Sequence, residues 1–287
     1  MNAHGGIKKL IVVAAVAALA AGCSAGESGA PVSAQEYTQV LGEVDTSLKE
    51  PFTALAKDDK AAFATVTQAL RAGAEKLDAT SAPEAVQDTQ DSVATSLREL
   101  SDVVEKAGSD KPACPAGSPA ATVLASEEAE QVRATTKELT TADATYAFGT
   151  FLPAAPAEQK RQLKNGAFVK KGGTGGVGEL EIKNGAGDTT VSLVAKGSKK
   201  PVFTVYVRGK GKHTVKGIKA GTYQVYTASG VDWDAKKKGF TRDCGFSKFE
   251  DDFKFDSAGV RWTITLEQVV GGNASTADVD PGEFPVG

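Results

Sequence analysis

The sequence KKGGTGGVG at residues 170–178 separates two parts of the chain that have different patterns of apolar residues. Before it, apolar residues recur every three or four positions, as on one face of a helix. After it, apolar and polar residues alternate, as on the two faces of a strand. A run this rich in glycine has few side chains to pack, so we interpret residues 167–178 as a linker. The sequence therefore predicts a multidomain fold, with an all-α antiparallel helical bundle at residues 35–166 and an all-β sandwich at residues 179–270.

Four amphipathic helices and one short helical piece are expected in the first domain. The sequence SAQE at residues 33–36 fits a capping box, and the first helix should follow it to about Leu55. The other segments are residues 59–77, residues 81–108, a helix after the Ser118-Pro119 pair, and a short piece at 156–165. An amphipathic helix cannot bury its apolar stripe alone, so a bundle is the simplest arrangement.

Six strands are expected in the second domain, followed by an acidic tail at residues 271–287. The predicted strands are residues 179–183, 190–195, 202–208, 213–218, 222–227 and 260–269. Turns rich in glycine and lysine separate several of them, which is typical of an all-β sandwich.

One run in this domain resembles a known type of sandwich. The sequence VKGIKAGTYQVY at residues 215–226 resembles the strand-turn-strand signature of prealbumin-like and collagen-adhesin B-type domains. The longer stretch 230–266 is similar to domains in uncharacterised secreted proteins of actinobacteria. These resemblances imply an immunoglobulin-like or prealbumin-like sandwich, and they imply no activity.

The N-terminus has the pattern of an export signal. Lys8 and Lys9 precede an apolar run at residues 10–21, which is shorter than the roughly 20 residues that a membrane-spanning helix needs. The run ends in LAAGC at residues 19–23, which resembles the lipobox of bacterial lipoproteins. This resemblance implies cleavage after residue 22, acyl chains on Cys23, and attachment to the extracytoplasmic face of the cell membrane. The alternative is a plain secretory signal in which the cysteine is incidental.

Residues 23–34 follow as a flexible tether. Nothing in the composition indicates a nucleic-acid partner, because the formal net charge is −3. Only His213 would remain after cleavage, which argues against histidine-rich metal sites and histidine-activated nucleophiles. No catalytic or cofactor-binding motif is present either, so we expect neither an enzyme nor a cofactor.

Two cysteines remain when Cys23 carries a lipid. In an exported chain, Cys114 and Cys244 are candidates for a disulfide bond, which would join the two domains. The alternative is two separate thiols.

The candidate ligand-binding residues lie in the second domain. We select Asp232, Trp233, Asp234 and Phe249 because carboxylates and aromatic rings occur together there. Calcium could be held by Asp232 and Asp234 with Asp251 and Asp252, although solvated acidic loops and core aromatics are the ordinary alternatives.

Together these patterns predict a lipid-anchored extracytoplasmic protein with a non-catalytic binding or scaffold role at the cell envelope. Its ligand would be an envelope polymer such as a glycan, a peptide or a protein. The first alternative is a lipoprotein that captures a substrate or an ion for a transporter or sensor. The second is a hydrolase that uses only carboxylates, as glycosidases do.

Overall fold

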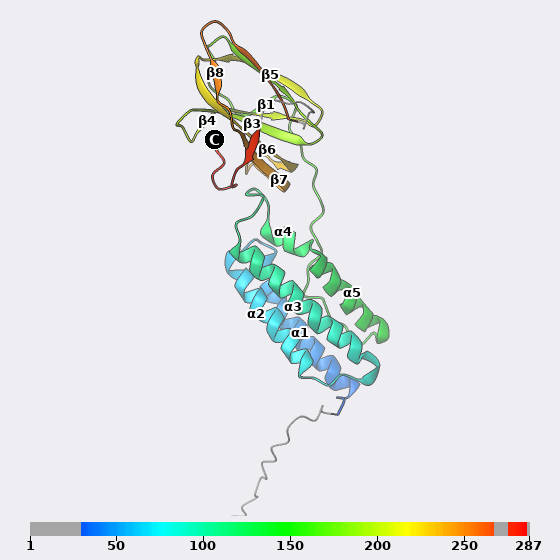
Figure 1. The fold of residues 1–287 in the computed structure, drawn as a ribbon. Helices are drawn as coiled ribbons and strands as arrows, with labels where there is room; N and C mark the ends of the chain where they lie inside the picture. The colour runs from blue at the N-terminus through cyan, green and yellow to red at the C-terminus, as the bar shows by residue number, and fades with distance from the viewer. Residues whose placement is uncertain (1–29, 267–274, 286–287) are drawn as a thin grey trace, which may run out of the picture.

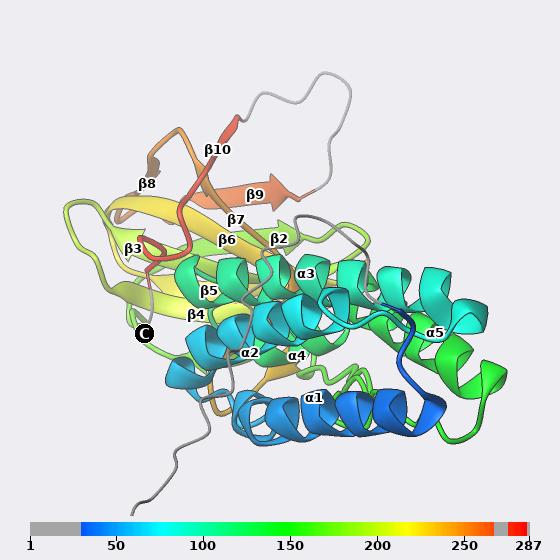
Figure 2. The ribbon, with the colours of Figure 1, turned by 90° about the horizontal axis from the view of Figure 1, so that it is seen from below.

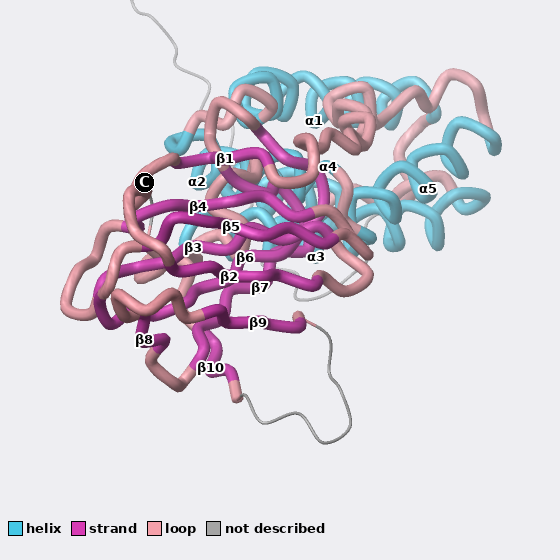
Figure 3. The backbone as a smooth tube through the Cα atoms, turned by 90° about the horizontal axis from the view of Figure 1, so that it is seen from above, coloured by secondary structure: helices cyan, strands magenta, loops and turns pink. Residues whose placement is uncertain are grey.

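The computed structural model describes residues 30–266 and 275–285, with helices in the N-terminal part and strands in the C-terminal part (Figure 1). The helices and the strands gather in two separate bodies (Figure 1), and the view from above looks onto the strands, with the helices partly behind them (Figure 3). The predicted order of a helical domain and a β-domain is therefore confirmed. Cys23 and the export signal lie outside the described residues.

Five α-helices and one short 3₁₀ helix form the helical domain within the described residues. They are α1 (Ala34–Leu55), α2 (Lys60–Asp78), η1 (Glu84–Val86), α3 (Gln87–Ser109), α4 (Pro119–Leu124) and α5 (Glu127–Ala142). The capping box at the start of α1 is present, since Ser33 accepts from the Glu36 amide and Glu36 accepts from the Ser33 amide. No helix among the described residues is both long and apolar enough to cross a membrane.

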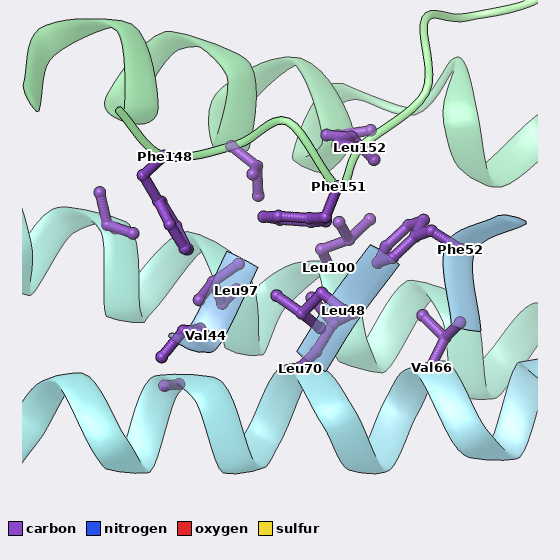
Figure 4. Close-up of a cluster of buried hydrophobic side chains, with 14 of the residues drawn as sticks. Val44, Leu48, Phe52, Val66, Leu70, Leu97, Leu100, Phe148, Phe151 and Leu152 are labelled. Carbon is purple, nitrogen blue, oxygen red and sulfur yellow. The ribbon is translucent and has the colours of Figure 1, made fainter. Parts of the chain in front are cut away.

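The core of the helical domain lies between α1, α2, α3 and α5, of which α1, α2 and α3 run side by side (Figure 2). Their apolar stripes meet in one cluster (Figure 4). The segment after α5 completes this cluster, because Phe148 and Phe151 insert between the helices and are at most 5 % exposed. Asp45 holds the segment in place by accepting hydrogen bonds from the amides of Gly149 and Phe151.

The short helix predicted at residues 156–165 is absent, and this stretch is extended. The amide and guanidinium groups of Arg161 bond to the β-domain, which favours an extended chain here over a helix. The connection between the domains therefore lies before residue 167. The stretch predicted as a linker, 167–178, contains a strand of the β-domain instead.

Within the described residues, ten strands form two sheets in the β-domain. They are β1 (Ala167–Lys170), β2 (Gly178–Lys183), β3 (Asp188–Ala195), β4 (Pro201–Val207), β5 (Lys212–Ile218), β6 (Gly221–Asp234), β7 (Gly239–Phe249), β8 (Phe253–Phe255), β9 (Arg261–Thr265) and β10 (Thr276–Asp278). The large sheet has the order β1-β4-β3-β6-β7-β10, with β8 also paired to β6. The small sheet has the order β5-β2-β9, in which β2 and β9 run parallel.

The two sheets enclose a common core, in the manner of a sandwich. Leu180 and Ile182 of β2 share one buried cluster with Val191 and Leu193 of β3 and Val205 of β4. The alternation seen in the sequence places these side chains on the inner faces.

Two parts of the β-domain differ from the prediction. The region around Cys244, where no strand was predicted between residues 227 and 260, is a hairpin of β6 and β7. The predicted tail contains β10, whose residues pair with β7 from Ser247 to Phe249. A strand edge presents unpaired amide and carbonyl groups, and β10 satisfies those of β7.

Candidate functional site

The two domains meet where the loop before α4 contacts the β6–β7 hairpin. Cys114 of this loop and Cys244 of β7 form a disulfide bond, with an S–S distance of 2.07 Å and Cα atoms 5.3 Å apart. The pairing expected from the cysteine count is therefore present. Lys237, at the tip of the hairpin, donates to the Gly117 carbonyl at 3.2 Å. The junction is thus joined covalently as well as through polar contacts.

Asp232 holds the connecting segment against the hairpin. Its carboxylate accepts from the Arg161 amide at 3.0 Å, from Arg161 Nε at 2.8 Å and Nη2 at 2.7 Å, and from Thr241 Oγ1 at 2.7 Å. The Asp232 side chain is only 4 % exposed, whereas that of Arg161 is 47 % exposed. The guanidinium hydrogen bonds hold the pKa of Asp232 well below its usual range. This carboxylate is therefore ionised and fully engaged within the protein.

Asp234 has a comparable structural role at the hairpin turn. It accepts from the amides of Lys236 and Lys237 at 2.8 and 2.9 Å, and from Arg161 Nη1 at 3.3 Å. The amide hydrogen bonds lower its pKa. A carboxylic acid that donates a proton in glycoside hydrolysis needs a raised pKa instead. Asp232 and Asp234 do not meet that requirement.

The four aspartates considered as calcium ligands do not come together. Asp232 and Asp234 lie at one end of the β6–β7 hairpin, whereas Asp251 and Asp252 follow the other end of β7. β7 has 11 residues, which at about 3.3 Å per residue separate the two pairs by roughly 35 Å. Asp252 is also paired with Lys196. No group of three or more histidine, cysteine, aspartate or glutamate residues in the described ranges could hold a metal ion.

The two aromatic candidates are both buried. Phe249 is 5 % exposed and belongs to the core between the sheets, where its ring packs edge-on against Phe253 at 5.6 Å. Trp233 is 4 % exposed and packs against Tyr206 and Phe240, with ring centroids 5.4 and 5.0 Å away. Neither ring offers an open surface for stacking. Trp233, however, forms part of the wall of a cavity.

This cavity, which we call the junction pocket, has a volume of about 210 Å³. Its lining residues are Pro115, Ala116, Val169, Lys170, Thr190, Ser192, Thr204, Ala228, Trp233, Lys237, Lys238, Gly239, Phe240, Phe246, Pro281, Phe284 and Pro285. They come from the loop before α4, the large sheet with its β6–β7 turn, and the C-terminal segment. The pocket therefore exists only where three separate parts of the chain meet.

Small hydroxyl residues of the large sheet contribute to the pocket. Thr190 and Ser192 alternate with core residues along β3, so they lie on the face that points away from the small sheet. The hydroxyl groups of Ser192 and Thr204 lie 2.8 Å apart and share a hydrogen bond. Ala228 of β6 pairs with Thr190 across the sheet. Short side chains at these positions leave room above the sheet.

The C-terminal segment closes one side of the pocket. The Val279 amide donates to the Phe246 carbonyl at 3.0 Å, directly after β10. The ring of Phe284 packs on Phe246 and on Tyr226, with centroids 5.1 and 6.0 Å away. Pro285, the last described residue, is buried. The tail that the sequence suggested as an acidic appendage is thus an apolar wall at this point.

Most of the pocket could not be found from local sequence signals. Trp233 was selected because carboxylates and aromatic rings occur together in this region, yet its two neighbouring aspartates bond to Arg161 and to the hairpin turn. Thr190, Ser192 and Ala228 were missed, although small residues alternating with branched apolar residues are a signal for a strand covered on both faces. Ala116 and Phe284 lie far apart in sequence, and only the tertiary fold brings them together.

No protein family, curated protein or solved structure matches the chain. The function is therefore argued from the geometry of the junction.

Proposed function

We propose that the protein is a lipid-anchored binding protein of the extracytoplasmic face of the cell membrane, and that the junction pocket is its ligand site. Its role is non-catalytic, either holding an envelope component or acting as a scaffold for one. The observation that supports this most is the position of the pocket between two braced domains, because ligand sites favour domain interfaces. Bracing by the disulfide and by the Asp232–Arg161 ion pair keeps such a pocket pre-formed.

The helical domain would then act as a spacer above the membrane. The lipid would be on Cys23, 11 residues before the first residue of α1, Ala34, as the lipobox resemblance implies. The longest helix, α3, has 23 residues and spans about 35 Å at 1.5 Å per residue. The β-domain, for which we propose an immunoglobulin-like or prealbumin-like type, would be held beyond this distance.

Metabolic labelling tests the anchor. The chain is expressed in a bacterium that processes lipoproteins and is fed an alkyne fatty acid. The parent protein should take up the label and sediment with membranes, whereas Cys23→Ser should lose both properties. Cys244→Ser is the matched control, because it removes a cysteine and should keep the label. Labelling of Cys23→Ser, or an unlabelled parent, would refute the anchor.

Native mass spectrometry tests the ligand site. Protein purified from its host under gentle conditions should carry a bound small compound. Ala228→Phe, which fills the pocket, should lose this compound, and Ala220→Phe should keep it because Ala220 is exposed on a turn outside the pocket. A compound that survives in a folded Ala228→Phe variant would place the ligand elsewhere.

A further inference from the structure

The chemistry of the junction pocket indicates one class of ligand. We infer that the pocket takes a small amphipathic anion, with an apolar body against the aromatic walls and a carboxylate or phosphate group beside Lys170. This inference rests on the proposed function, because it requires that the pocket is the ligand site. It adds the size, the polarity and the charge of the ligand.

The volume limits the size of the ligand. A cavity of about 210 Å³ lies below the roughly 300–1,000 Å³ of sites that hold drug-sized molecules. A single ring or a short acyl chain fits such a space, whereas an oligosaccharide or a folded protein surface does not. An extended peptide could place only one side chain or one terminus in the pocket.

The walls favour an apolar body. Trp233, Phe240, Phe246 and Phe284 all line the cavity, and ring pairs among them pack edge-on, as Trp233 and Phe240 do at an interplanar angle of 81°. Phe246 and Phe284 are half-buried, so a ligand ring or chain can pack against them, whereas Trp233 and Phe240 are 4 % exposed and contribute only a small part of the wall. Burying an apolar ligand here removes its surface from water, which favours binding.

The charges favour an anion. The charged residues that line the pocket are all lysines, and no aspartate or glutamate lines it, although the whole chain has a net charge of −3. Lys170 is half-buried, and no carboxylate of the described residues lies within 4.0 Å of its amine. Lys237 is exposed and donates to a neutral carbonyl, so the half-buried Lys170 is the cation that a ligand would pair with. Partly buried ammonium groups are stabilised by an opposite charge, which a ligand anion would supply.

The hydroxyl pair adds a donor to the pocket. Ser192 and Thr204 each carry one O–H, and the hydrogen bond between them uses one of these two protons. Within the described residues, the other proton has no acceptor. An anionic oxygen accepts from such a group more strongly than a neutral one does.

The test compares an anion with its neutral counterpart. We use phenylbutyrate and its amide, which have nearly the same shape. In a Trp262→Phe background Trp233 is the only tryptophan, so its fluorescence reports on the pocket. Phenylbutyrate should bind saturably, and the amide should bind about tenfold more weakly. Lys170→Met should weaken phenylbutyrate by about the same factor and leave the amide unchanged.

Two variants separate the pocket from other surfaces. Lys171→Met is the matched control, because Lys171 is the exposed neighbour of Lys170 and does not line the cavity, so binding should be unchanged. Ala228→Phe should abolish binding of both compounds. If that variant does not fold, Ala116→Phe fills the pocket from the loop before α4, outside both domain cores.

The outcomes distinguish the inference from the proposed function. Equal binding of phenylbutyrate and its amide, or no effect of Lys170→Met, overturns the anion class and leaves the pocket as a ligand site. No saturable binding of either compound at millimolar concentration also overturns the inference, while a compound that purifies with the protein and is lost from Ala228→Phe would still support the site. Binding that persists in folded pocket-filling variants overturns both.

Discussion

Replacing Asp232 with asparagine removes one negative charge from the domain junction and leaves the shape of the side chain almost unchanged. The carboxylate accepts two guanidinium hydrogen bonds from Arg161 at 2.8 and 2.7 Å. Hydrogen bonds to charged groups contribute about 1.5–3 kcal/mol, and the partly exposed arginine places the effect toward the lower end. We expect Asp232→Asn to lower the free energy of unfolding of the β-domain by about 2 kcal/mol at neutral pH.

Alanine at the same position should cost more. Asp232 has a φ of +61°, a left-handed conformation that asparagine and aspartate tolerate better than alanine does. Asp232→Ala loses all four hydrogen bonds and adds about 1 kcal/mol of backbone strain, so its total cost should be about 3–4 kcal/mol.

The cost of Asp232→Asn should also depend on pH. Because the pKa of Asp232 is lowered by folding, its charge stabilises the folded state fully above the unfolded pKa of about 3.9. This stabilisation is lost as the pH falls through the folded pKa. The difference between the parent protein and Asp232→Asn should therefore be full at neutral pH and shrink as the pH falls below about 4.

Urea unfolding followed by Trp233 fluorescence in the Trp262→Phe background measures these differences, and urea avoids the screening that guanidinium salt would add. Equal stability of the parent and Asp232→Asn at neutral pH would refute the assigned role of the ion pair. If the stability difference between the parent protein and Asp232→Asn does not change on acidification, the interaction that the substitution removes is not electrostatic.

Four further variants test other parts of the fold. Leu97→Ala, at a fully buried position between the helices, should cost the helical domain about 3 kcal/mol in thermal unfolding, and a cost under about 1 kcal/mol would contradict the packing. Gly166→Ala should cost about 2 kcal/mol because φ is +77° and a Cβ would lie 2.3 Å from an imidazole nitrogen. Gly187→Ala, where a Cβ meets nothing within 4 Å, should change stability by less than about 0.5 kcal/mol, and equal effects of the two glycine changes would refute the contact. Replacing Cys114 and Cys244 together with serine should speed hydrogen exchange in the loop before α4 and in the β6–β7 turn, while exchange in both domain cores stays slow.

The order of the domains could be predicted because periodicity survives in each part of the sequence. The stripe that begins at Tyr37 is buried along α1, and Leu180 and Ile182 of β2 point into the sandwich core. The boundary between the domains was misplaced because a high glycine content indicates a flexible chain but does not show whether neighbouring residues pair in a sheet. Ala167–Lys170 precede the glycines and pair with β4, and their contacts lie about 35 residues later in the sequence.

The site was less predictable than the fold. Asp232 was selected for its charge, and its partner Arg161 was placed in a helix, since a pattern of spacing cannot show that a side chain bonds to another domain. The disulfide could be predicted because only two thiols remain once Cys23 is set aside. The junction pocket depends on short side chains, such as that of Ala228. In a single sequence, a small residue is only a weak indication of a cavity.

The disulfide also determines how the chain carries mechanical load. A force that pulls the two ends apart passes from α1 through α3 to Cys114, crosses the S–S bond to Cys244, and leaves along the C-terminal segment. The chain between the cysteines, which contains α4, α5 and β1 to β6, is bypassed by this path. The two cysteines are 130 residues apart, so about 450 Å of extended chain is withheld while the bond is intact. Reduction would bring this stretch into the loaded path, so the oxidation state of one bond decides whether α4, α5 and β1 to β6 bear tension, whereas the chain after Cys244 bears it in either state.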